Sequence, residues 1–219
     1  MMERTEALQL FLDATFVAFD RFAKDLRSRD SILRIFALLE VAGARGTRSG
    51  KRLPVCTRYL DDALAVETEH TVLRSVVTRF RAIEPSLHWN WRSTYDNSAS
   101  KNFLMGHANA MIAGPDGVED RGDLWLGVSL LAPHVRYPDH DHAPEETYLA
   151  LSEGEFMQEE IWFSPGIGGS FYNPAGIKHA MRSGDKPLFT LWALLPDQAQ
   201  HRERRDWGEQ RYLVLTNVS

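Results

Sequence analysis

The spacing of apolar residues changes once along this chain of 219 residues, and that change constrains the fold more than any other feature. Up to about residue 85, apolar residues recur every three to four positions, as on one face of an amphipathic helix. From about residue 103 onward they form short runs rich in Val, Ile, Leu and aromatic residues, separated by Gly, Pro and Asp. Such runs, at intervals of about 8 to 15 residues, indicate a β-sandwich or barrel. The chain is therefore predicted to be mainly β, with an α-helical N-terminal subdomain.

The helical half contains three amphipathic stretches. Apolar residues of the first are expected on one buried face: Leu8, Phe11, Leu12, Phe16, Phe19, Phe22, Ala23 and Leu26. The second, SILRIFALLEVAGARG, has Ser31 as its expected N-cap. The third is expected as one helix over residues 60–83, ending before Pro85.

We predict a helical subdomain over residues 1–100 and a β-barrel catalytic domain over residues 101–219. The formal net charge of −5 offers no basic field for a phosphate backbone, so nucleic acid is not an expected partner. No stretch has the roughly 20 apolar residues that span a bilayer, and the N-terminus lacks the basic start of a signal peptide. The single cysteine, Cys56, fits a reducing compartment. We expect a cytoplasmic protein without a membrane partner.

One segment of the β half, YPDHDHAPEETY at residues 137 to 148, gathers groups that bind metals or carry protons. His140 and His142 lie two residues apart, so an extended strand would point both imidazoles to one face. Glu146 and Tyr148 share this parity. The expected fourth ligand is His179, at the end of a Gly/Pro-rich turn that would return a neighbouring strand past the first. These residue types favour a divalent metal site.

The order of these residues resembles the two motifs of the cupins. The first motif, G(x)5HxH(x)3-4E(x)6G, is matched by His140, His142, Glu146 and, one position late, Gly154. The second, G(x)5PxG(x)2H(x)3N, is matched by Gly168, Pro174, Gly176 and His179. His134 stands in place of the opening glycine, and Ser183 in place of the closing asparagine. The resemblance covers about residues 103 to 197 and implies a jelly-roll barrel that holds one divalent metal ion.

The flanking tyrosines narrow the resemblance. The form Tyr-x-x-His-x-His-x-x-x-Glu-x-Tyr, with a later His, is similar to the cupin-type dimethylsulfoniopropionate (DMSP) lyases. The helical N-terminal extension and the chain length make it most like the DddL type. The resemblance implies cleavage of DMSP into dimethyl sulfide and acrylate. It also implies four metal ligands and two catalytic tyrosines: His140, His142, Glu146 and His179, with Tyr137 and Tyr148.

The chemistry of this elimination fits these residue types. Removing a proton next to a carboxylate builds negative charge, which a metal bound to that carboxylate would stabilise as a Lewis acid. A tyrosine base needs its pKa of about 10 lowered, and a nearby dication favours the phenolate. We expect one tyrosine to be the base, with Tyr148 preferred, and Tyr137 to orient the substrate. An aromatic face would hold the sulfonium cation by cation–π attraction. Five aromatic residues of the predicted strands are candidates: Trp125, Trp162, Tyr172, Phe189 and Trp192.

Two alternatives remain open from the sequence. The same ligand set supports other metallocupin enzymes, such as an Fe(II) dioxygenase or an isomerase. A non-catalytic cupin that binds a small ligand is the second alternative, although the two tyrosines argue against it. Zn, Fe, Mn, Co and Ni all suit these ligand types. The expected partner is the small molecule DMSP, and a homodimer is suggested because cupins commonly pair.

Overall fold

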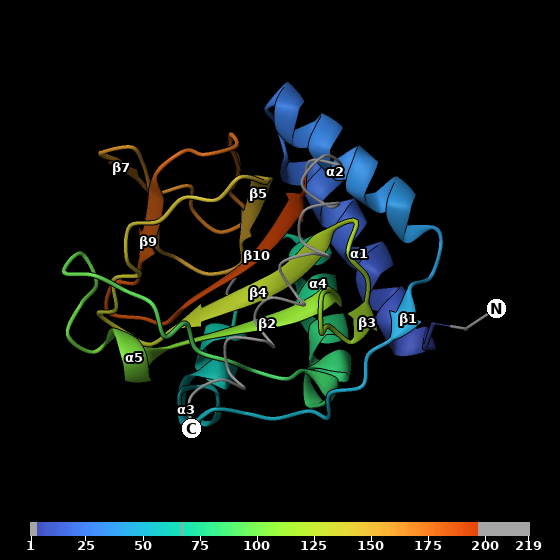
Figure 1. Ribbon diagram of the computed structural model, residues 1–219, viewed down its shortest axis with the longest axis horizontal. Helices are drawn as coiled ribbons and strands as arrows, with labels where there is room; N and C mark the ends of the chain where they lie inside the picture. The colour runs from blue at the N-terminus through green and yellow to red at the C-terminus, as the bar shows by residue number, and fades with distance from the viewer. Residues whose placement is uncertain (1–3, 67, 197–219) are drawn as a thin grey trace, which may run out of the picture.

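The computed structural model describes residues 4–66 and 68–196 (Figure 1). The helices are α1 (Glu6–Phe22), α2 (Leu26–Leu39), α3 (Pro54–Ala63), α4 (Thr71–Ile83), the 3-10 turn η1 (Glu84–Ser86) and α5 (Phe103–Gly106). The strands are β1 (Ala44–Arg45), β2 (His107–Gly114), β3 (Glu119–Asp120), β4 (Trp125–Leu131), β5 (Glu145–Ala150), β6 (Glu155–Gln158), β7 (Ile161–Phe163), β8 (Ser170–Asn173), β9 (His179–Arg182) and β10 (Leu188–Leu195). The change of apolar period along the chain thus separates helices from strands, as predicted.

The strands form two sheets. The larger has the order β1-β3-β2-β4-β10-β5-β8 and the smaller the order β7-β6-β9. The chain passes from one sheet to the other between β5 and β6, between β7 and β8, between β8 and β9 and between β9 and β10. This alternation makes two facing sheets out of one chain, as in a jelly roll. The predicted class, a mainly β cupin barrel with an N-terminal helical region, is confirmed.

Helices α1 to α4 cover one side of the large sheet, away from β7 and β9 (Figure 1). α2 contacts β5, β8 and β10, and α3 contacts β2, β4 and β10. At the centre of this layer, the ring of Phe80 in α4 lies 5.0 Å from that of Phe189 in β10. Buried apolar residues of both halves therefore form one continuous core. The boundary between residues 100 and 101 stays a prediction, and residues 197–219 of the expected barrel domain lie outside the described residues.

Two expected helix boundaries are wrong. α2 begins at Leu26, because the side chain of Asp25 accepts hydrogen bonds from the backbone N–H groups of Arg27 and Ser28 and caps the helix there, not at Ser31. Leu26 is consequently 81% exposed instead of joining the buried face of α1. The stretch over residues 60–83 is not one helix but the end of α3, a break and then α4. Apolar periodicity runs through this break without a proline or glycine to mark it.

The first helix packs largely as expected. Phe11 and Phe19 are fully buried, whereas Phe16 and Phe22 are only partly buried against the core. The expected burial is therefore confirmed for Phe11 and Phe19 and is only partial for Phe16 and Phe22. None of the helices within residues 4–66 and 68–196 combines the length and apolarity that a membrane crossing requires.

The two residues that depart from the cupin motifs lie at one turn. His134, where the motif has glycine, has φ of +58°, a left-handed conformation that glycine adopts without strain. Ser183 is buried, donates its hydroxyl hydrogen to the carbonyl of Ala132 and accepts from the backbone N–H of Val135. A serine hydroxyl thus bridges the turn where the motif has asparagine.

Candidate active site

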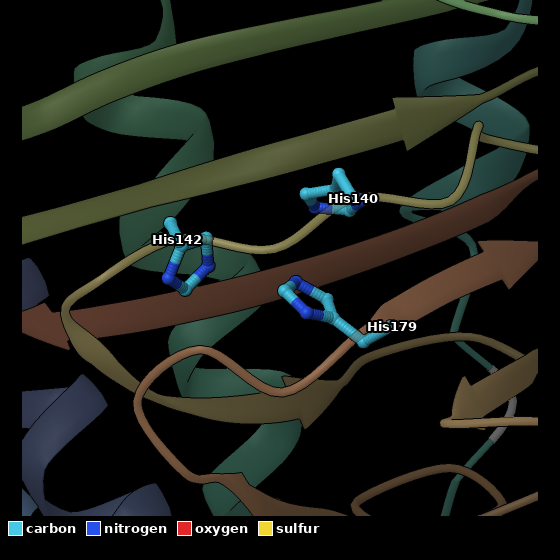
Figure 2. Close-up of side chains that lie close together, drawn as sticks. All are labelled: His140, His142 and His179. Atoms are coloured by element: carbon cyan, nitrogen blue, oxygen red, sulfur yellow. The ribbon is translucent and has the colours of Figure 1, made fainter.

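Three histidines from two segments meet inside the barrel (Figure 2). His140 and His142 lie in the segment before β5, and His179 begins β9. Figure 2 shows their rings pointing toward one another, and each offers a ligand nitrogen within 4.8 Å of the other two. The backbone N–H groups of His140 and His179 donate to each other's carbonyl oxygens at 3.0 and 2.8 Å. The expected regular strand through His140 and His142 is wrong, since β5 begins only at Glu145, but the two segments do lie side by side as predicted.

Hydrogen bonds to the backbone fix the tautomer of all three rings. Each Nδ1 lies 2.8 to 2.9 Å from the carbonyl oxygen of a residue two positions away, those of Pro138, Pro144 and Ile177. A carbonyl oxygen only accepts, so each neutral ring carries its hydrogen on Nδ1. The Nε2 lone pairs therefore face the centre of the cluster, which is the orientation that a metal ligand needs.

Glu146 completes the cluster with a buried carboxylate. Its Oε2 atom lies 3.3 Å from Nε2 of His142 and 3.3 Å from Nε2 of His179, and it accepts a hydrogen bond from Asn173 Nδ2 at 3.2 Å. Burial alone would raise the pKa of Glu146, but His142 and His179 outweigh it and hold this pKa below its ordinary value. Burial would likewise lower the pKa of His142, yet the Glu146 carboxylate outweighs burial and raises it.

These four side chains fit a divalent metal ion. The Nε2 lone pairs and the carboxylate oxygens are all acceptors, so their convergence is favourable only with a cation or protons between them. Nε2 of His179 is buried and finds no hydrogen-bond partner among the residues that the structure describes. Burial and the neighbouring His179 lower the pKa of His140 to about 3, which keeps its Nε2 free of a proton at neutral pH. Imidazole nitrogens and one carboxylate form the donor set expected from the sequence.

Both predicted tyrosines are buried beside the histidines. The ring of Tyr137 lies 5.1 Å from that of His140, and the ring of Tyr148 lies 6.4 Å from that of His179. Burial and the Glu146 carboxylate raise the pKa of Tyr148 well above its ordinary value. Burial also raises the pKa of Tyr137, although a nearby arginine and asparagine act in the opposite direction. The structure therefore brings all six predicted site residues together.

The five aromatic candidates for the sulfonium separate into two groups. Three have surroundings away from the histidines: Trp162 lies under the Arg182 guanidinium at 4.2 Å, Tyr172 under that of Arg27 at 5.0 Å, and Phe189 against Phe80. Trp192 is the cross-strand partner of Tyr148, and Trp125 alternates with Gly127 onto the same face of the sheet. Trp192 is therefore the candidate that the strand register places beside Tyr148.

Three polar residues near Tyr137 were missed by the sequence analysis. The Arg92 guanidinium carbon lies 5.8 Å from the Tyr137 ring centroid, and its charge lowers the pKa of both Tyr137 and His140. Asn109 of β2 donates to the Tyr137 hydroxyl, and Ser129 of β4 donates to Asn109. Arg92 lies in an irregular segment without a motif. The other two do carry a signal, since a polar residue facing the inside of a barrel strand is exceptional.

The fold and the converging residues define a cupin with a centre of three histidines and one carboxylate. The family model described as dimethylsulfoniopropionate lyase matches residues 27–190, and the chain belongs to this family. It is 28% identical over 145 residues to the dimethylsulfoniopropionate lyase DddQ of Ruegeria pomeroyi, covering 64% of this chain and 69% of that protein.

Two solved structures show the same fold over most of the chain. The crystal structure of the DMSP lyase DddQ from Ruegeria pomeroyi matches with a TM-score of 0.69 at 23% identity, over 89% of this chain and 94% of that one. Crystal structures described as those of the DMSP lyases RdDddP and RnDddQII include a chain with a TM-score of 0.60 at 23% identity, over 86% and 92%. The Ruegeria pomeroyi relative carries the DddQ name, and the expected likeness to the DddL type stays a prediction.

Proposed function

We propose that this protein cleaves DMSP into dimethyl sulfide and acrylate by a β-elimination that depends on a divalent metal ion. The observation that carries the proposal is that a cluster of metal-ligand side chains lies next to two tyrosines in a member of this family. Three histidine nitrogens and the buried Glu146 carboxylate, all acceptors, lie close together, and two buried tyrosines adjoin them. The cluster suits a metal, and the tyrosines supply groups that can move a proton.

The proposed ligands are His140, His142, Glu146 and His179. A divalent metal held by them would act as a Lewis acid on the substrate carboxylate and would favour the Tyr148 phenolate. Asn173 positions the Glu146 carboxylate through its Nδ2 hydrogen bond, and the three backbone carbonyls orient the imidazoles.

Tyr148 is the proposed base. Its phenolate oxygen takes the proton from the carbon next to the carboxylate, the electron pair of that C–H bond forms the new double bond, and the C–S bond breaks. Dimethyl sulfide leaves with the electron pair of that bond, and acrylate remains. The sequence places Tyr148 two residues after Glu146 on β5, so both side chains lie on the same face.

Tyr137 is proposed to orient the substrate from the opposite side, and Trp192 to lie against the sulfonium group. A sulfonium is a soft cation, which the face of an indole attracts by about 0.5 to 2 kcal/mol. The Arg92 guanidinium adds positive charge near Tyr137, where the carboxylate end of the substrate would be attracted.

The direct test measures headspace dimethyl sulfide and dissolved acrylate after mixing purified protein with DMSP. Chelator-treated protein and protein reloaded with single metals would be compared with the untreated protein. We expect equal amounts of both products, lost on chelation and restored by metal. Tyr148→Phe should reduce kcat by about 10³-fold, and Tyr137→Phe by less.

Folded, metal-loaded protein that releases neither product would contradict the proposal. Oxygen uptake with an organic substrate would then favour a dioxygenase of the same fold. Equal and mild losses in the two tyrosine variants would leave the lyase reaction standing but overturn the assignment of the base.

A further inference from the structure

A line of hydrogen bonds crosses the inside of the barrel and ends on Tyr137. Trp192 Nε1 of β10 donates to Ser129 Oγ of β4 at 3.0 Å, and Ser129 Oγ donates to Asn109 Oδ1 of β2 at 2.7 Å. Asn109 Nδ2 then donates to the Tyr137 hydroxyl oxygen at 3.2 Å. We call Trp192, Ser129 and Asn109 the relay. It joins three neighbouring strands of the large sheet to one of the two site tyrosines.

The direction of every bond in the relay follows from its first member. An indole N–H can only donate, so Ser129 Oγ must accept from Trp192 and must turn its own hydrogen toward another acceptor. That acceptor is Asn109 Oδ1, and the contact decides which way the Asn109 amide is turned. The Nδ2 end of the amide is consequently the one that faces Tyr137. The Tyr137 oxygen therefore accepts from the relay and cannot donate to it.

The backbone of β4 makes room for this arrangement. Trp192 is paired in register with Gly127, and the indole lies across that glycine to reach Ser129 two residues further along the strand. A Cβ atom at Gly127 would come within 2.2 Å of Trp192 Cη2. The absence of a side chain at Gly127 thus allows the indole N–H to meet Ser129. Asn109 and Ser129 are direct cross-strand partners, so the next bond needs no displacement of either strand.

We propose that the relay is a positioning device that makes the Tyr137 oxygen an acceptor on its β2 side and so reserves the hydroxyl hydrogen for the site. Arg92, a second polar neighbour, is also a donor without any acceptor atom in its side chain, and both nitrogens of the adjacent His107 ring already have partners. These neighbours therefore leave the Tyr137 hydrogen to point toward a group in the site, such as the substrate. Ser129 and Asn109 act through Tyr137 and do not themselves touch the reacting atoms, and Trp192 fixes their orientation through its indole N–H. This inference rests on the proposed function only for the identity of the group that receives the Tyr137 hydrogen.

The test compares three substitutions in the metal-loaded full-length protein. Asn109→Asp keeps the shape but removes the donor, so Tyr137 must give its hydrogen to the new carboxylate. We expect kcat to fall about 10²-fold with KM changed less than about threefold, because one preorganised donor is lost. Ser129→Ala unties the Asn109 amide, and we expect an approximately tenfold fall in kcat. Ser129→Thr keeps the hydroxyl and should restore kcat to within about threefold of the original protein.

Thr190→Val is the matched control. Thr190 is buried in β10 directly beside Ser129, and its hydroxyl donates to the Leu149 carbonyl outside the relay. The substitution removes a buried hydroxyl from the same layer, so it reproduces any general packing effect without touching Tyr137. Equal losses of kcat in Ser129→Ala and Thr190→Val would overturn the relay.

A second readout does not depend on turnover. The indole N–H resonance of Trp192, assigned with Trp192→Phe, should move and lose protection from hydrogen exchange in Ser129→Ala but not in Thr190→Val. An unmoved resonance in Ser129→Ala would overturn the relay even if activity fell. Should the unaltered protein release no acrylate with any metal, the proposed function fails, and the indole resonance alone still supports or overturns the relay.

Discussion

Two buried carboxylates in this protein, Glu119 and Glu146, have opposite surroundings. Glu119 on β3 receives the Arg4 guanidinium at 2.6 Å and that of Arg121 at 2.8 Å, and both arginine side chains are themselves buried. Glu146 on β5 lies 3.3 Å from the Nε2 atoms of two histidines. Each of these rings carries its hydrogen on Nδ1, on the side away from Glu146. Both carboxylates have a lowered pKa, since in each case the partners outweigh burial.

The difference separates a structural ion pair from a ligand-binding group. Arginine stays charged in proteins, so Glu119 is compensated permanently and ties the start of α1 to the edge of the large sheet. Histidine carries a charge only when protonated, so the Glu146 cluster is compensated only while protons or a cation occupy it. A buried carboxylate among neutral acceptors therefore indicates a site for a ligand, whereas one between arginines indicates a structural link.

The largest expected effect is on activity at the Glu146 cluster. Glu146→Gln keeps an acceptor for Asn173 but removes the negative charge, and we expect kcat/KM for acrylate formation to fall about 10³-fold. Metal affinity should weaken by at least about 100-fold, measured by competition with a chromogenic chelator. Unimpaired metal binding in this variant would contradict the distinction between Glu146 and Glu119, because Glu146 would then not be a ligand.

The reverse pattern is expected at Glu119. Glu119→Gln leaves the buried Arg4 guanidinium without its charge partner and leaves Arg121 paired with Asp123 alone, so the free energy of unfolding should fall by about 3 kcal/mol. Denaturant melts at pH 7 would measure the loss, and activity per folded molecule should stay unchanged. A fall in activity without a fall in stability would show that this cluster also serves the reaction.

His107, a buried histidine outside the Glu146 cluster, should make the stability of the fold depend on pH. His107 is 1% exposed, accepts from the Arg92 backbone N–H at 2.7 Å and donates to the Phe103 carbonyl, so its neutral form is satisfied at both nitrogens. Burial lowers its pKa from 6.5 to about 4. The unfolded chain therefore binds a proton first as the pH falls, and the stability held above pH 6.5 is lost between pH 6.5 and 4.

That loss should amount to roughly 2 to 3 kcal/mol, from about 1.4 kcal/mol per unit of pKa shift. In His107→Gln, the difference between the free energies of unfolding at pH 7 and pH 4 should shrink by this amount. Comparing differences between two pH values cancels the direct effect of the substitution. An unchanged difference would assign the acid sensitivity to other groups.

The smallest effect is expected at an ion pair on the surface. Arg81 and Asp61 lie 2.6 Å apart, as close as Arg4 and Glu119, but their side chains are 46% and 80% exposed. Asp61→Asn should change the free energy of unfolding by no more than about 0.5 kcal/mol, because water and salt screen the pair. A loss as large as that of Glu119→Gln would show that distance and not burial governs these ion pairs.

The cluster of three histidines and one carboxylate and the general fold were predictable because their signals are local. The spacing of His140, His142 and Glu146 lies within seven residues, and His179 ends a turn marked by glycine and proline. Helix ends were less predictable. Asp25 and Ser31 are both good N-caps, and the side chain of Asp25 is the one that accepts hydrogen bonds from the first N–H groups of the helix. The break between α3 and α4 carries no local signal at all.

The order of residues along the chain was enough to predict which residue types the site contains and that a barrel would gather them. The folded structure was needed to assign the hydrogen-bond directions of these residues and the charges that surround them. The Nδ1 hydrogens are fixed by nearby carbonyls, and the Tyr137 oxygen by a relay that begins on β10 and passes through β4 and β2. The direction of a hydrogen bond depends on the atoms at both ends, and here those atoms belong to strands far apart in the sequence. Periodicity and motif spacing describe one segment at a time and carry no such information.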